Sequence, residues 1–146
     1  HLDPFLLNGL AASDLLLTPT PPAQVDFHST LKYLTRLPEM LERLEEEGVE
    51  PRLSASIGFM SKMTSKRDHE TSHSLAREVY ASNILDSSLP RLDGFERCGE
   101  SFDTIISANP VSYPGSAEAL KKARTEAERF TKAVFDRIEY IRGASK

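Results

Sequence analysis

The sequence is poor in several features that would assign it to a specialised class of protein. It contains one cysteine, Cys98, which excludes an intrachain disulfide and fits a reducing compartment. No apolar run approaches the roughly 18 residues of a membrane-spanning helix, so neither a membrane segment nor a membrane partner is predicted. The formal net charge of -4 restricts any DNA contact to a local basic patch.

Glycine is also scarce. The seven glycines are dispersed, so the chain has no glycine-rich loop of the kind that cradles phosphates with backbone N–H groups and a lysine. These residues alone are therefore not expected to hydrolyse a nucleoside triphosphate. The hydrophobic content of 39% and the charged content of 27% are ordinary for a soluble globular protein.

The residues that are present alternate between helical and strand patterns. Asp3 and Pro4 predict a helix start, with a capping carboxylate before a proline in the first turn. Apolar spacings of three and four predict helices over 3–12, 26–47, 68–80 and 116–142, the second of them kinked or split by Pro38. Compact apolar runs predict strands over Leu15–Thr18, Leu53–Met60 and Ile84–Leu89.

This alternation predicts an α/β fold, with a parallel sheet and helices on both faces. Three strands are few for such a sheet, so further strands are expected upstream of the chain. Ligands of parallel sheets bind at the carboxyl ends of strands. The segment Leu89–Pro110, which follows the last strand and carries two glycines and several charges, is therefore predicted to be a polar loop at the functional end.

The sharpest short motif is an H-E-x-x-H sequence at residues 69–73. On a helix, His69 and His73 would face one way and could bind zinc, with Glu70 as a general base. Arg67, two places earlier, is charged, and no third ligand is marked. A polar helix surface is the simpler interpretation, and a zinc peptidase stays as an alternative, as does a non-enzymatic α/β interaction module.

Several separate blocks resemble ParA, the partition ATPase of plasmids and prophages in the MinD/Soj class of deviant Walker ATPases. They are H-L-D-P-F-L-L-N, P-P-A-Q-V-D-F-H-S-T-L-K-Y, I-G-F-M-S-K, S-L-P-R-L-D-G-F-E-R-C-G-E-S, N-P-x-S-Y-P-G-S-A-E-A-L and A-V-F-D-R-I-E, in the expected order. The resemblance implies that residues 1–146 are the carboxyl-terminal part of one P-loop NTPase-like ATPase domain. The phosphate loop and the Walker B strand of that domain would lie upstream.

The resemblance also implies a nucleotide site. Pro90 and Arg91 would follow the strand that ends beside the adenine, and Met60 would end another strand that borders the same pocket. His1 and Asp3 would belong to the switch segment that senses the γ-phosphate. The implied cofactors are ATP or ADP with Mg²⁺, and no residue of this segment is expected to be catalytic.

Arg97 takes the position at which the resemblance implies an arginine for DNA binding that is independent of sequence. A guanidinium on a loop can donate paired hydrogen bonds to phosphate oxygens, although a salt bridge to Glu96 or Glu100 is the competing interpretation. The basic residues that could extend the patch are Lys121, Lys122, Arg124, Arg129 and Lys132. Interspersed glutamates make a solvated helix face the alternative for most of them.

The implied assembly is a nucleotide-dependent homodimer, cytoplasmic and associated with the nucleoid, whose hydrolysis a ParB-type centromere-binding protein stimulates. Cys98 has no second cysteine, and nothing in the sequence places it beside a histidine base, so it is predicted to be structural.

Overall fold

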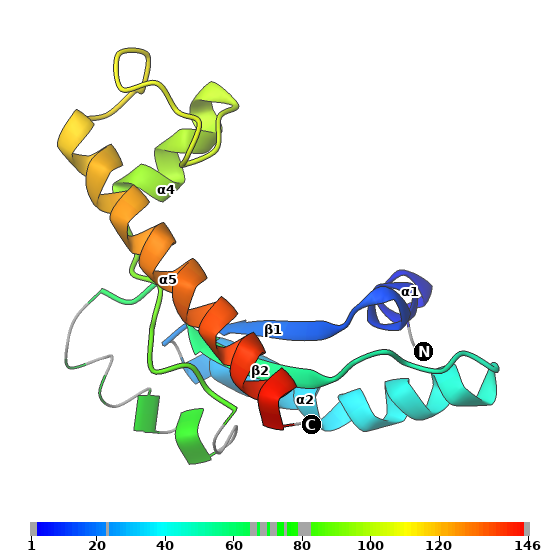
Figure 1. Ribbon diagram of the computed structural model, residues 1–146. Helices are drawn as coiled ribbons and strands as arrows, with labels where there is room; N and C mark the ends of the chain where they lie inside the picture. The colour runs from blue at the N-terminus through cyan, green and yellow to red at the C-terminus, as the bar shows by residue number, and fades with distance from the viewer. Residues whose placement is uncertain are drawn as a thin grey trace.

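The computed structural model describes residues 3–22, 24–64, 67, 70, 73, 74, 76–78 and 83–144. In chain order its elements are α1 (Pro4–Ala12), β1 (Leu15–Thr20), α2 (Gln24–Glu46), β2 (Ala55–Met60), α4 (Asp93–Cys98), the 3-10 turn η1 (Gly99–Ser101) and α5 (Ala117–Ala144) (Figure 1). The described residues between 67 and 78 are helical, and Asp68, the predicted cap of that helix, lies outside them. No helix in the described part of the chain is long and apolar enough to cross a membrane.

Two of the predicted helix starts are made by side-chain caps. The Asp3 carboxylate accepts a hydrogen bond from the Phe5 amide at 2.9 Å, and proline occupies the first turn of α1. The Ser116 hydroxyl accepts one from the Ala119 amide at 3.1 Å at the start of α5. The predictions for 3–12 and 116–142 are confirmed to within two residues at each end.

The helix α2 runs through Pro38 without being split. Proline removes one amide donor from the helix ladder, yet the apolar face on both sides of it stays packed. Leu37, Met40 and Leu44 are buried against α1, which keeps the two halves of α2 in one element.

The two strands form a parallel pair, with Leu15 opposite Ala55 and Thr20 opposite Met60. Side chains on a strand alternate between faces. Leu15, Ile57 and Phe59 pack against α5, whereas Leu16 packs with α1 and α2, and Met60 with Phe27 and Leu34 of α2. The prediction of a parallel sheet with helices on both faces is confirmed.

The predicted third strand, Ile84–Leu89, is not a continuous strand. It forms two isolated parallel bridges, one between Ile84 and Gly58 of β2 and one between Pro90 and Met63, three residues after the end of β2. Five positions separate the bridges on the first side and six on the second, so the segment carries one residue too many for a regular ladder. The surplus residue breaks the ladder between the two contacts.

The predicted polar loop contains a helix. Asp93–Cys98 forms α4, which packs across the amino-terminal half of α5, at the end of α5 far from both chain termini (Figure 1). A Cβ on Gly94 would lie 2.5 Å from the Cβ of Ala123, so only glycine permits this approach of the two helices. The side chain of Cys98 is buried with Tyr113 and Leu120, which supports its structural assignment.

Candidate functional site

A cavity of about 350 Å³ opens at the carboxyl ends of the strands, where parallel α/β sheets bind their ligands. Pro19 comes from β1 and Phe59 from β2, and the remaining walls come from residues that follow β2, from the segment before α4 and from α4 itself. The lining residues are Pro19, Phe59, Ser61, Lys62, Leu89, Pro90, Arg91, Leu92, Phe95 and Glu96. This volume is within the range of small-molecule sites, and we call the cavity the strand-end pocket.

The lining of the strand-end pocket is mostly apolar, with a few charged groups. Phe59, Phe95 and Pro90 offer flat apolar surfaces, which suit an aromatic ring. The Nε of Arg91 lies 2.9 Å from a carboxylate oxygen of Glu96, and both side chains are exposed. The exposed Lys62 supplies a second cation. The arrangement suits a ligand with a flat apolar part and an anionic part.

Backbone hydrogen bonds fix one wall of the strand-end pocket to the end of β2. The Leu89 amide donates to the Met60 carbonyl at 2.8 Å, and the Arg91 amide donates to the Met63 carbonyl at 3.0 Å. Between these points Lys62 has a φ of 54°, a left-handed conformation that is uncommon for a residue other than glycine. Such backbone outliers concentrate at functional sites, which is consistent with a binding role for this turn.

Only some of the residues predicted to bind the nucleotide line the strand-end pocket. Pro90 and Arg91 both line the strand-end pocket. The side chain of Met60 has none of its surface exposed and packs with Phe27 and Leu34, so Met60 reaches the pocket wall only through its carbonyl group. Asp3 caps α1, and His1 lies outside the described residues.

Most pocket residues were not named individually from the sequence. Phe59, Ser61 and Lys62 belong to the I-G-F-M-S-K run, which the resemblance places beside the same pocket, although only Met60 of that run was given as a site residue. Phe95 comes from α4, which was predicted to be a loop, and no local pattern marks it.

Arg97 is held by neighbours on two sides. Its Nε lies 2.8 Å from the Asp93 carboxylate, one turn earlier on α4, and its Nη1 donates to the Pro114 carbonyl at 3.2 Å. The expected partners, Glu96 or Glu100, were wrong: Glu96 pairs with Arg91 instead. The side chain of Arg97 stays 41% exposed, so an anion can still reach it.

The other predicted DNA-binding residues differ in their surroundings. Lys121 and Lys122 are exposed on the first half of α5. Arg124 instead points back to the protein, where its guanidinium donates to the carbonyl groups of Ile105 at 2.8 Å, of Ile106 at 3.1 Å and of Ala108. These bonds pin the segment between η1 and α5 and leave Arg124 little capacity for an outside phosphate.

His73, from the H-E-x-x-H sequence, is buried and not part of a polar helix surface, which corrects that expectation. Its Nε2 lies 3.2 Å from the Leu85 carbonyl, and because a carbonyl oxygen only accepts, Nε2 carries the proton. His69 lies outside the described residues. Among the described residues no group of three or more histidine, cysteine or acidic side chains is placed to hold a metal ion.

Two known proteins are similar to this chain over nearly all of its length. Plasmid partition protein A of Escherichia coli is 63% identical over 142 residues, which cover 97% of this chain and 36% of that protein. A solved structure named Partition Protein is 78% identical, with a TM-score of 0.70, over 98% of this chain and 34% of its own. The chain thus spans about a third of the length of each relative. A search of protein families gives no match.

Proposed function

We propose that this chain, a relative of plasmid partition protein A, supplies the carboxyl-terminal part of the ATPase domain of a ParA-type protein that segregates plasmids. The single observation that carries the proposal is the strand-end pocket, which lies where α/β sheets bind ligands in a chain 63% identical to a partition protein. In this proposal the protein is a P-loop NTPase, and its phosphate loop and Walker B strand are supplied upstream of residues 1–146.

The nucleotide of the proposed site is ATP or ADP. The apolar walls around Phe59, Pro90 and Phe95 would take the adenine ring, and the cations of Lys62 and Arg91 lie at the same pocket for the anionic part. Mg²⁺, when bound, would neutralise charge on the phosphates. Because no acidic cluster of the described residues suits a metal, its ligands are assigned to other residues.

The proposed cycle joins this site to DNA. The protein would bind nucleoid DNA as an ATP-bound homodimer in the cytoplasm, and a ParB-type centromere-binding protein would stimulate hydrolysis. The DNA surface that we assign consists of Arg97 on α4 and of Lys121 and Lys122 on the first half of α5. The side chain of Arg97 is 41% exposed, and both lysines are exposed. Phosphate contacts from such residues position a protein on DNA without reading its sequence.

The test is an equilibrium titration of ATP with the full-length partition protein and its Arg91→Ala variant. Loss of a cation from the strand-end pocket is expected to weaken ATP binding roughly tenfold, as for a hydrogen bond to a charged group. Arg36→Ala is the matched control, because Arg36 forms a comparable exposed pair with Glu39 on α2, at 3.8 Å. Equal ATP affinity of the wild type and Arg91→Ala would remove Arg91 from the site, and absence of ATP binding by the wild type would overturn the proposed function.

A further inference from the structure

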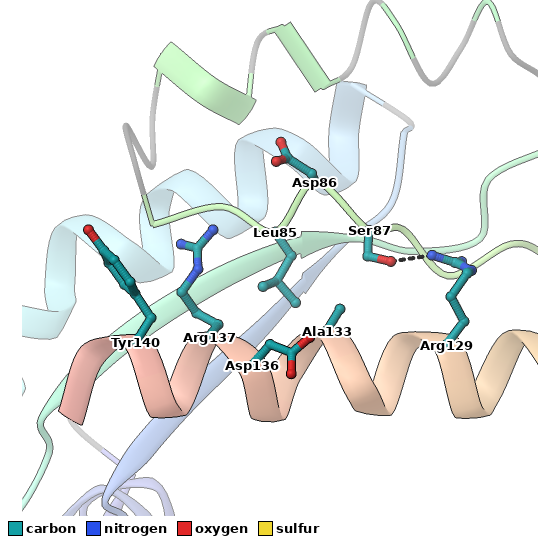
Figure 2. A pocket seen from close by; sticks show the side chains of 8 residues that line it. All are labelled: Leu85, Asp86, Ser87, Arg129, Ala133, Asp136, Arg137 and Tyr140. Atoms are coloured by element: carbon teal, nitrogen blue, oxygen red, sulfur yellow. Dashed lines mark hydrogen bonds between the residues drawn. The ribbon is translucent and has the colours of Figure 1, made fainter. Parts of the chain in front are cut away.

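Arg129 of α5 reaches across to the segment that precedes the strand-end pocket. Its Nη1 donates to the Ser87 hydroxyl and its Nη2 donates to the Ser88 carbonyl at 2.6 Å. The carboxylate of Glu126, one turn earlier on α5, accepts from Nε at 2.9 Å and from Nη2 at 2.6 Å and orients the guanidinium. Figure 2 shows the Arg129 side chain extending from the helix to Ser87.

These contacts replace hydrogen bonds that the sheet does not supply. The segment from Ile84 to Pro90 is bonded to β2 near its two ends, where the Leu85 amide donates to Gly58 and the Leu89 amide to Met60, and the surplus residue interrupts the ladder between these bonds. Ser87 and Ser88 lie in the interrupted part, directly before Leu89, whose amide is bonded to β2. The Arg129 guanidinium therefore holds Ser87 and Ser88 from the α5 side, in the part of the segment that lies between its two bonds to β2.

The residues that follow Ser88 form a wall of the strand-end pocket. Leu89, Pro90 and Arg91 all line it. The Leu89 and Arg91 amides are bonded to Met60 and Met63 on one side, and Arg129 adds an anchor on the other side through the residues directly before them. Misplacement by about an ångström can cost on the order of 10²-fold in catalysis, so a second anchor for a pocket wall is of consequence. Arg129 itself does not line that pocket.

We propose that Arg129 is a positioning residue for the nucleotide site: it sets the wall Leu89–Arg91 against the base, and it does so without touching the nucleotide. This inference rests on the proposed function, because it takes ATP as the ligand of the strand-end pocket. In this inference α5 both covers the sheet and positions a wall of the strand-end pocket. Arg129 is then not part of the DNA-binding patch to which its charge had assigned it.

Arg137 provides a matched control from the same helix. It lies two turns after Arg129, and its Nη2 donates to the Ile84 carbonyl at 3.2 Å, at the far end of the same segment (Figure 2). Ile84 is already bridged to β2, so loss of Arg137 leaves that end held by the sheet. Both substitutions remove an arginine from α5 and a hydrogen bond from the same segment, but only Arg129 contacts the residues directly before the pocket wall.

The experiment is a set of equilibrium titrations with the full-length partition protein, using ATP and inorganic triphosphate as probes. Arg129→Ala is expected to weaken ATP binding about tenfold and triphosphate binding clearly less, because ATP uses the apolar wall as well as the cation of Arg91, whereas triphosphate uses only the cations. Arg129→Lys, which keeps the charge and one donor, is expected to recover part of the loss, and Arg137→Ala to stay within about twofold of the wild type.

Each outcome decides the matter. ATP affinity of Arg129→Ala within about twofold of the wild type would overturn the inference. So would an equal loss of ATP and triphosphate binding by Arg129→Ala and Arg129→Lys, which is the signature of a general structural defect. If Arg129→Ala does not fold, the ratio of ATP to triphosphate affinity in Arg129→Lys still decides. A wild-type protein that binds triphosphate but not ATP would overturn the proposed function and the inference together.

Discussion

The two halves of α5 pack against different kinds of partner. The carboxyl-terminal half covers the sheet, where Val134 and Phe130 meet the strand side chains Ile57 and Phe59, the two phenyl rings with their centroids 4.7 Å apart. The amino-terminal half lies beside α4 and the segment 102–116, with Leu120 as its largest buried side chain. We call these the sheet region and the α4 region.

The α4 region has a small apolar cluster and depends on polar contacts to the backbone. Cys98, Ala108, Tyr113 and Leu120 are its buried members, and Phe102, Ile106 and Val111 of the same segment are largely exposed. A segment without ladder partners must satisfy its carbonyl groups in another way. Arg124 and Arg97 do this here, by donating to four carbonyl groups between Ile105 and Pro114.

The contrast predicts that large-to-small substitutions act mainly in the sheet region. Ile57→Ala is expected to lower the free energy of unfolding by about 2–5 kcal/mol, because Ile57 has none of its surface exposed and packs between Leu85 and Val134. Ile106→Ala, whose parent side chain is 61% exposed, is expected to lower it by less than about 1 kcal/mol. Chemical denaturation of the two variants measures both values. Equal losses of unfolding free energy would mean that the two regions do not differ in how they are stabilised.

The next prediction concerns the close contact that joins α4 to α5. A Cβ on Gly94 would also lie 3.0 Å from the carbonyl oxygen of Ala119, so Gly94→Ala must push the helices apart. We expect a loss of about 1–3 kcal/mol, confined to the α4 region and read as faster hydrogen exchange of the α4 amides. Gly99→Ala is the control, because its Cβ would meet nothing within 4 Å.

A compensating substitution sharpens that test. Ala123→Gly removes the methyl group that lies 2.5 Å from the new Cβ, so the double variant is expected to regain part of the protection of α4. If the second substitution leaves the protection unchanged, the clash with the Ala119 carbonyl oxygen, and not the clash with the Ala123 methyl group, separates the helices.

How much of this the sequence predicts depends on whether a pattern is local. The cap and proline at Asp3 and Pro4, and the long apolar face of α5, are local patterns, and both helices were predicted. The register of Ile84–Pro90 is not local, because its extra residue shows only against β2. The six residues of α4 are too few to display a helical period, so they were predicted as a loop.

The candidate site divides in the same way. The end of a buried apolar run marks the position of Pro90 and Arg91, and both line the strand-end pocket, whereas their role toward a nucleotide comes from the resemblance. The partners of Arg124 lie 16–19 residues away and are backbone carbonyl groups, which every residue carries and no sequence pattern distinguishes. Charge alone therefore added Arg124 and Arg129 to the patch around Arg97, although the contacts of the three arginines differ.

The arginines of the α4 region give the third prediction. Arg124→Ala is expected to lower stability by about 1–2 kcal/mol, because three carbonyl groups lose a charged donor. Arg97→Ala is expected to cost less than about 1 kcal/mol, since it breaks an exposed pair, and instead to reduce the slope of log DNA affinity against log salt by about one.

Asp93→Asn separates the two roles of Arg97. It removes the same ion pair and keeps the cation, so DNA binding should persist in Asp93→Asn and weaken in Arg97→Ala. DNA titrations at several salt concentrations, with unrelated duplexes, make the measurement. If Arg97→Ala binds DNA with the wild-type slope, the DNA surface lies elsewhere.

The smallest effect expected is at Tyr113, the largest buried side chain contributed by the segment 102–116. Its hydroxyl is buried and has no hydrogen-bond partner among the described residues. Tyr113→Phe removes that hydroxyl and keeps the ring, so stability near neutral pH is expected to stay equal or to rise by up to about 1 kcal/mol. In the sheet region, by contrast, the loss of side-chain atoms in Ile57→Ala is expected to destabilise the protein.

The titration of Tyr113 predicts how the stability of the α4 region changes with pH. Burial raises the pKa of the Tyr113 phenol above its ordinary value of 10.0, and the negative potentials of Cys98 and Asp93 add to the shift, while Arg97 opposes it. In the unfolded chain the phenol loses its proton near its ordinary pKa, and in the folded chain only at higher pH. The unfolded state therefore binds fewer protons between the two values, and stability falls as pH rises above about 10.

Tyr113→Phe is expected to reduce this loss of stability at alkaline pH in the α4 region. Hydrogen exchange or thermal melting across the alkaline range measures the difference. An alkaline profile that is the same in both proteins would assign the loss of stability to other groups and leave the unsatisfied hydroxyl without a measurable consequence.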